Sequence, residues 1–161
     1  MRNPGISVVV TAYNKGKFIG DSIKSVLSQE YGDFELIIID DGSTDNTREI
    51  ISSFSDERIR YHYQANSGLP ACARNKGMSL STGAYISLLD GDDFWYKGKL
   101  QKSKRVLDDM PDVGLVWHNE AIVHNGRVLN YTSYKPYADD MYERLLFEGK
   151  CLPVSAATMR R

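Results

Sequence analysis

The sequence predicts an α/β fold in which a mostly parallel, Rossmann-like sheet is flanked by helices. Three short apolar runs, at 6–10, 34–39 and 85–89, have few polar residues and suit strands that are buried on both faces. The segments between these runs show the spacing of amphipathic helices. Alternation of strand and helix is typical of a doubly wound sheet with crossover connections.

The helices and the third strand can be placed from local signals. Apolar residues fall on one face of a helix over about 17–29. A second helix is expected after Ser43–Asp45, because short polar side chains are favoured at helix N-termini. Residues 59–64 alternate between apolar and polar and predict a more exposed strand, and Pro70 suits the first position of a third helix. The order through Asp90 is therefore β-α-β-α-β-α-β.

The rest of the chain predicts a smaller part of mixed character. In order we expect a helix, a strand, a hairpin, a long loop and a last helix, over 100–110, 113–118, 122–129, 131–140 and 141–147. Asn125 and Gly126 form a favoured two-residue turn at the tip of the hairpin. The aromatic and proline residues of the long loop could line a cleft or pack on the surface.

Composition excludes several classes of protein. The 161 residues suit one domain, and 42% apolar with 25% charged residues is typical of a globular chain. A formal net charge of -1 gives no long-range attraction to nucleic acid, so no nucleic-acid partner is expected. The N-terminal apolar run is too short for a signal peptide or a transmembrane segment, which favours a cytoplasmic location. Cys72 and Cys151 lack metal-ligand spacing and are expected as free thiols.

The most informative motif follows the run at 85–89. Asp90, Asp92 and Asp93 would place three carboxylates at the end of a buried strand, where they repel one another unless water, a cation or protonation relieves them. Carboxylates are preferred ligands of Mg²⁺ and Mn²⁺, which complete their shells with phosphates and water. The alternative is an acidic surface turn or a helix N-terminus that favours negative charge.

Polar residues also follow the other strands, and strand ends of an open α/β sheet meet at one rim. Asp40 or Asp41 could accept a hydrogen bond from a nucleobase or a ribose, or could cap the following helix. Tyr13 could stack on a base or pack as an ordinary aromatic residue. Arg74 could reach phosphate oxygens or lie on a solvated helix face.

Taken in order, these motifs resemble a known family. The stretches that carry the resemblance are VVVTAYNKGKFIGDSIKSVLSQEYGDFELIIIDDGSTDNT, NSGLPACARNKG and GAYISLLDGDDFW. They closely resemble the family 2 inverting glycosyltransferases of GT-A fold over 6–100, and the likeness is looser from Val113 onward. The resemblance implies one GT-A-like domain over 1–161, with a donor-binding half at 1–98 and the start of an acceptor half at 99–161.

The resemblance also implies roles for particular residues. Thr11, Tyr13 and Asp41 match the nucleoside pocket, with weaker matches at Asn14 and Asp40. Arg74 and Asp90 match positions that bind the donor diphosphate. Asp92 is the expected ligand of a Mn²⁺ or Mg²⁺ ion, with Asp90 and Asp93 as weaker candidates.

The implied reaction is metal-assisted transfer of a sugar, with inversion, from a nucleotide-diphosphate-sugar such as a UDP-sugar. The acceptor would be a hydroxyl of a glycan, a lipid-linked sugar or another molecule. An acceptor linked to lipid would allow the protein to be located peripherally at the inner face of the membrane. Inversion needs a base that takes the acceptor proton. In the family this base lies in a recognisable motif, and none of the candidate carboxylates here lies in one; they are Glu120, Asp139, Asp140, Glu143 and Glu148. We therefore expect the base beyond Arg161, in a longer enzyme of which this chain is the N-terminal portion.

Three other hypotheses are open. The chain could bind a nucleotide sugar without turnover, because the base is missing from its motifs. A nucleotidyltransferase would be expected to have a Gly-rich loop after the first strand, which TAYNKGKF lacks. A phosphoacceptor domain built on Asp40 and Asp41 would leave Arg74 and the cluster at 90–93 unexplained.

Overall fold

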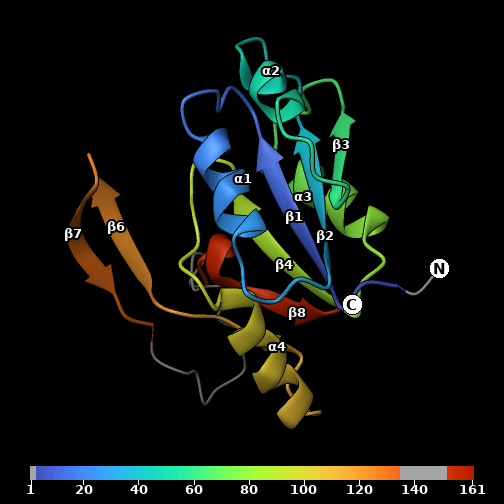
Figure 1. Cartoon of the computed structure of the whole chain (residues 1–161), viewed down its shortest axis with the longest axis vertical. Coiled ribbons are helices and arrows are strands. Elements are labelled where there is room, and N and C mark those ends of the chain that lie inside the picture. The colour runs from blue at the N-terminus through green and yellow to red at the C-terminus, as the bar shows by residue number, and fades with distance from the viewer. Residues whose placement is uncertain (1–2, 135–151) are drawn as a thin grey trace.

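A six-stranded sheet forms the centre of the computed structural model, which describes residues 3–134 and 152–161 (Figure 1). In spatial order its strands are β3 (Ile59–Tyr63), β2 (Phe34–Asp40), β1 (Ile6–Ala12), β4 (Tyr85–Asp90), β8 (Thr158–Arg160) and β5 (Leu115–Val116). The first four are parallel, and β8 runs antiparallel to both of its neighbours. This arrangement confirms the α/β fold with a mostly parallel sheet.

Helices cover both faces of the sheet. They are α1 (Ile19–Leu27), α2 (Thr47–Ser52), α3 (Pro70–Leu80) and α4 (Lys99–Asp109), with a short 3-10 helix at Val154–Ala156. The main core cluster joins α1, α2 and α4 to one face, whereas α3 packs on the other, as α1 in front and α3 behind show in Figure 1. Every residue of β1 and β2 is buried, which explains why these strands are apolar and β-branched on both faces.

Most of the predicted elements are present, with shifted ends. The second helix begins only at Thr47, because the Asp45 carboxylate accepts hydrogen bonds from the backbone N–H and the hydroxyl of Thr47, at 3.0 and 2.5 Å. The strand predicted at 113–118 is reduced to β5. The short strand β8 was not predicted, since three residues with mixed polarity carry no strand signal of their own.

The predicted hairpin is confirmed and is longer than expected. Strands β6 (Glu120–His124) and β7 (Arg127–Thr132) pair antiparallel and extend away from the central sheet (Figure 1). Asn125 and Gly126 have φ of 49° and 73°, which two-residue hairpin turns of this type require. Because β7 runs to Thr132, it occupies the start of the segment predicted as a loop.

Several expectations fall outside the described residues. They concern the rest of the loop at 135–140, the helix at 141–147, and Cys151. Cys72, which is described, is exposed and is a free thiol as expected. In the two stretches that the structure describes, no helix is both long enough and apolar enough to cross a bilayer.

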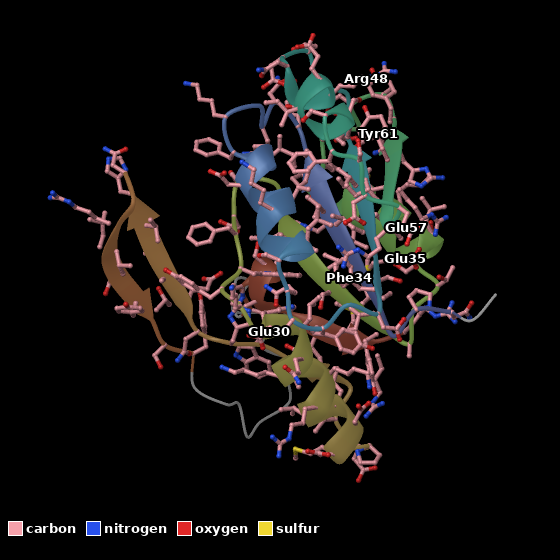
Figure 2. All side chains as sticks on the ribbon, viewed as in Figure 1. Glu30, Phe34, Glu35, Arg48, Glu57 and Tyr61 are labelled. Atoms are coloured by element: carbon pink, nitrogen blue, oxygen red, sulfur yellow. The ribbon has the colours of Figure 1, made fainter. Side chains whose placement is uncertain are left out.

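A buried carboxylate holds the N-terminal ends of the parallel strands together. Glu35 lies at this end of β2, beside Phe34 (Figure 2), and is 8% exposed. It accepts hydrogen bonds from the Ser7 hydroxyl at 2.6 Å, from the backbone N–H and hydroxyl of Thr82 at 2.8 and 2.7 Å, and from Arg60 at 2.5 Å. Burial alone would raise the pKa of Glu35, but these donors outweigh it and lower the pKa to about 2. The charge therefore stabilises the junction of four segments.

We predict that Glu35→Gln lowers the free energy of unfolding by roughly 2–3 kcal/mol at neutral pH. The lowered pKa means that the ionised form stabilises the fold fully above the ordinary value of 4.5, and that this contribution is lost as the pH falls toward 2. Denaturant unfolding from pH 7 to pH 3 should show the difference between the variant and the unsubstituted protein shrinking. Glu57→Gln, at an exposed position, is the control. Equal losses for the two variants would contradict the prediction.

Candidate functional site

The carboxyl ends of the parallel strands open on a pocket of about 410 Å³, which we call the rim pocket. It brings together six of the residues predicted to form a site: Thr11, Tyr13, Asp41, Arg74, Asp90 and Asp92. Three other predicted residues, Asn14, Asp40 and Asp93, are not part of its lining. The sheet therefore gathers most of the predicted set at one edge, as expected for an open α/β sheet.

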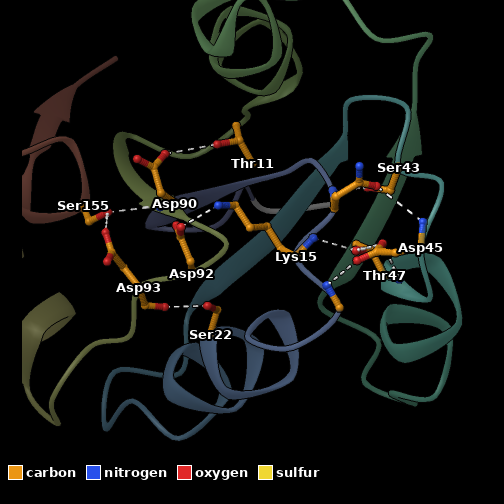
Figure 3. Close-up of polar contacts among 12 residues, drawn as sticks. Thr11, Lys15, Ser22, Ser43, Asp45, Thr47, Asp90, Asp92, Asp93 and Ser155 are labelled. Atoms are coloured by element: carbon orange, nitrogen blue, oxygen red, sulfur yellow. Dashed lines mark hydrogen bonds and ion pairs between the residues drawn. The ribbon is translucent and has the colours of Figure 1, made fainter. Parts of the chain in front are cut away.

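Two cations of the protein neutralise the acidic strand end. A terminal nitrogen of Arg74 donates to both carboxylate oxygens of Asp90, at 2.8 and 2.9 Å. The Nζ atom of Lys15 lies 2.5 Å from Oδ2 of Asp92 (Figure 3). Thr11 adds a hydroxyl hydrogen bond to Asp90 at 3.2 Å. The repulsion among the carboxylates, which a metal ion was expected to relieve, is thus relieved here by side chains. Lys15 was not among the predicted site residues.

Asp93 faces the C-terminal segment instead of the rim pocket. The Ser155 hydroxyl donates to its carboxylate at 2.5 Å and accepts the backbone N–H of Asp90 at 3.1 Å (Figure 3). Desolvation raises the pKa of Asp93; the Ser155 hydrogen bond opposes this, and the neighbouring Asp92 and Asp90 carboxylates raise it further. Ser155 therefore holds the acidic loop at two points. No local signal could have identified it, because it lies 62 residues from Asp93.

Asp41 is the one of the two adjacent aspartates that faces the rim pocket. It is 6% exposed, and its carboxylate accepts hydrogen bonds from Gln64 at 2.6 Å and from the Ser67 hydroxyl at 3.0 Å. These donors fix the orientation of the carboxylate.

Asp40 is fully buried and points into the fold. It accepts a hydrogen bond from Tyr61 at 2.9 Å and from the backbone N–H of Ser43 at 2.8 Å. Burial, followed by the hydrogen bond to Asp40, raises the pKa of Tyr61 to about 12. Asp40 therefore joins β2, β3 and the next turn. It does not cap α2, whose N-cap residue is Asn46.

Asn14 joins two loops next to the rim pocket. Its side-chain oxygen accepts the backbone N–H of Thr44 at 2.8 Å, and its own N–H donates to the Ser43 hydroxyl at 3.0 Å. The residue has a positive φ of 52°, a conformation that Asn tolerates better than most residues. This geometry favours a structural role for Asn14.

Tyr13 and Arg74 present groups that a ligand could use. The Tyr13 ring is 47% exposed at the rim pocket. The Arg74 side chain is only 23% exposed, so it does not lie on a solvated helix face. Its Nε atom is buried and has no hydrogen-bond partner within the described residues. A buried guanidinium N–H without an acceptor costs free energy, and an anion such as a phosphate could accept its hydrogen bond.

The donor set fits a metal ion only together with an outside ligand. No group of three His, Cys, Asp or Glu side chains within residues 3–134 and 152–161 could enclose a cation. The Asp92 carboxylate is 40% exposed at the rim and offers oxygen ligands there. This fits an Mg²⁺ or Mn²⁺ ion whose shell is completed by phosphate oxygens and water.

A second pocket, of about 560 Å³, lies between the acidic loop, α4 and β6, and we call it the hairpin pocket. Its lining includes the aromatic side chains of Trp95, Tyr96 and Trp117, together with Glu120. The Glu120 carboxylate accepts a hydrogen bond from Tyr134 at 2.8 Å. The other carboxylates considered for the base, at 139, 140, 143 and 148, lie outside the described residues. Among described residues, only Asp92 lines both pockets.

We predict that Ser155→Ala lowers the free energy of unfolding by roughly 1–2 kcal/mol, because Asp93 and the Asp90 N–H both lose their partner. Ser53→Ala is the control, since the exposed Ser53 hydroxyl bonds only a carbonyl of its own helix. Thermal unfolding of both variants measures the effect. An unfolding temperature equal to that of the control would show that Ser155 does not hold the acidic loop.

Comparison with known proteins bears on the whole chain. The sequence model described as Glycosyl transferase family 2 matches residues 7–161. A glycosyltransferase of Nostoc sp. is 32% identical over 163 residues, which cover 97% of this chain and 50% of the relative. The UDP-Glc:alpha-D-GlcNAc-diphosphoundecaprenol beta-1,3-glucosyltransferase WfgD of Escherichia coli is 33% identical over 124 residues, which cover 77% of this chain and 49% of the relative.

A solved structure shows the same arrangement. The crystal structure of S. aureus TarS 1-349 in complex with UDP-GlcNAc superimposes with a TM-score of 0.68 at 26% identity, covering 78% of this chain and 36% of that TarS chain. The chain spans half or less of the length of these relatives. Because the family match runs from the first strand to the last residue, this chain belongs to glycosyl transferase family 2 and has a GT-A type of fold.

Proposed function

We propose that this chain is the nucleotide-sugar-binding part of a glycosyltransferase that transfers a sugar, with inversion, to a hydroxyl acceptor. The observation that carries the proposal is the rim pocket, where Asp41, Arg74 and Asp92 converge. A UDP-sugar is the donor that we favour, because TarS, at 26% identity, was solved with UDP-GlcNAc.

The nucleoside would bind at the β1 and β2 side of the rim pocket. Tyr13 offers an exposed ring for stacking on the base. The Asp41 carboxylate, oriented by Gln64 and Ser67, has lone pairs left to accept a base or ribose hydrogen bond. Thr11 already donates to Asp90, so it would shape the pocket more than it binds the donor.

The diphosphate would bind at the β4 side. Arg74 would give its unpartnered Nε–H to a phosphate oxygen while its terminal nitrogen stays on Asp90. Asp92 would hold a divalent ion, with Asp90 near it and Asp93 kept aside by Ser155. When bound, such an ion supplies Lewis-acid neutralisation of the charge that develops on the departing diphosphate.

The hairpin pocket is where we place the acceptor. Inversion requires the acceptor hydroxyl to approach the anomeric carbon from the side opposite the diphosphate, with a base to take its proton. Asp92 lines both pockets, so the reacting carbon would lie near it. We do not assign the base to Glu120, because its carboxylate is engaged by Tyr134 and no supporting motif surrounds it.

A lipid-linked sugar is the acceptor class that the relatives favour. The name of WfgD specifies a sugar linked to diphosphoundecaprenol, and its likeness to this chain covers 49% of its length. An acceptor of this kind would place the reaction at a membrane surface. This is compatible with peripheral association, as expected from the sequence.

We predict that UDP binds in the presence of Mn²⁺ and that Asp92→Asn weakens this binding roughly tenfold to a hundredfold, the effect of losing one charge-assisted contact. Isothermal titration calorimetry at saturating Mn²⁺ measures the change. Asp109→Asn, on the exposed end of α4, is the matched control. Binding that needs no metal and is unchanged in Asp92→Asn would refute the assignment.

Turnover separates an enzyme from a binding module. If this chain suffices for catalysis, incubation with UDP-sugar, Mn²⁺ and an acceptor should release UDP steadily. UDP binding without release would instead identify the chain as a donor-binding part that needs a base from elsewhere. The buried position of Asp40 argues against this residue as a phosphoacceptor, because a phosphate source could not reach it.

A further inference from the structure

Lys15 is a charged residue of the rim pocket to which the proposed function gives no role. It lies in the connection from β1 to α1, where its backbone is fixed. Its N–H donates to the Thr47 hydroxyl at 2.8 Å, and its carbonyl accepts the N–H groups of Phe18 and Ile19, both at 2.9 Å. Only the side chain is therefore free to change partner, and it reaches across the pocket to Asp92 (Figure 3).

The two basic residues of the rim pocket are held differently. Arg74 bonds both oxygens of Asp90 through one nitrogen and is 23% exposed. Lys15 makes one contact, to a single oxygen of Asp92, and is 32% exposed. An ammonium on a flexible stem with one exposed contact exchanges partners more easily than a guanidinium held at two oxygens.

The balance of charge in the pocket favours an exchange. Lys15 and Arg74 together neutralise Asp90 and Asp92, so these four groups have no net charge. The diphosphate of a nucleotide sugar carries two negative charges, and a divalent ion carries two positive ones. If the ion takes Asp92 and a phosphate oxygen takes Lys15, every charge keeps a partner of opposite sign. A divalent ion that arrives alone would instead leave Lys15 facing a dication.

We propose that Lys15 is an exchangeable counter-ion of the donor site. It holds Asp92 while the site is empty, and it moves to the diphosphate when the donor arrives with a divalent ion. This inference rests on the proposed function and adds a donor-binding residue to it. It also explains why the metal and the nucleotide should bind cooperatively. A metal ion on Asp92 would leave Lys15 unpaired, and a phosphate on Lys15 would leave Asp92 unpaired, so each ligand binds the group that the other releases.

The test is Lys15→Met, which keeps an unbranched side chain one atom shorter and removes its charge. Binding of Mn²⁺ alone, followed by electron paramagnetic resonance, should become roughly fivefold tighter, as expected for the loss of one partly exposed ion pair. Binding of UDP at saturating Mn²⁺, followed by calorimetry, should become roughly fivefold weaker for the same reason. Both shifts should shrink at high salt, which screens exposed charges.

The matched control is Lys24→Met, because Lys24 pairs with Asp21 on the exposed side of α1 at 3.9 Å. Thermal unfolding confirms that both variants fold. Opposite shifts for the two ligands in Lys15→Met alone would support the exchange, because a structural defect would weaken both. Unchanged Mn²⁺ binding, or shifts in the same direction, would overturn it. If even the unsubstituted protein fails to bind UDP with Mn²⁺, the proposed function fails, and the Mn²⁺ titration still decides whether Lys15 competes for Asp92.

Discussion

Asp90, Asp92 and Asp93 bring three carboxylates to the end of one strand, and each is held by a different part of the chain. Arg74 on α3 holds Asp90, Lys15 before α1 holds Asp92, and Ser155 holds Asp93. Mutual repulsion is thereby converted into a set of contacts that joins both faces of the sheet to its carboxyl edge. Only the Asp92 contact is a single, partly exposed ion pair, which makes this carboxylate the one most accessible to an outside cation.

The C-terminal segment completes the support of this edge. Strand β8 pairs with β4, so Ser155 comes to lie beside the acidic loop. The buried Lys99 donates to the hydroxyls of Ser87 and Thr158 at 3.0 and 2.7 Å, and its Nζ atom lies 4.0 Å from the centre of the Trp95 ring. Burial lowers the pKa of Lys99 well below its ordinary value. The residues from 154 to 160 therefore pack against β4 and the acidic loop.

The sequence was sufficient for the elements whose signals are local. Runs such as 34–39 are apolar on both faces because the parallel strands are covered on both sides, and Asn125-Gly126 specifies its own turn. Strand β8 could not be predicted, because its three residues become a strand only by pairing with β4 and β5. Elements that depend on tertiary pairing carry no comparable signal in the chain.

The same limit applies to the candidate site. Position after a strand was enough to propose Asp41 and Asp92, and Arg74 was proposed as a basic residue of the helix after Pro70. The fold brings all three together at the rim pocket. Neighbouring residues of a strand point to opposite faces. Position alone could therefore not show that Asp40 is the one that turns inward, to Tyr61. The partnership of Lys15 with Asp92 spans 77 residues and depends on how the loops meet.

In the proposed function, Asp92 holds a divalent ion against the diphosphate of a nucleotide donor. A crystal structure with UDP and Mn²⁺, with the metal located by its anomalous scattering, tests this most directly. We expect one manganese peak in contact with an Asp92 oxygen and with oxygens of the diphosphate, and Arg74 in contact with the diphosphate. A bound nucleotide in the rim pocket with no manganese at Asp92, or with manganese held elsewhere, would contradict it.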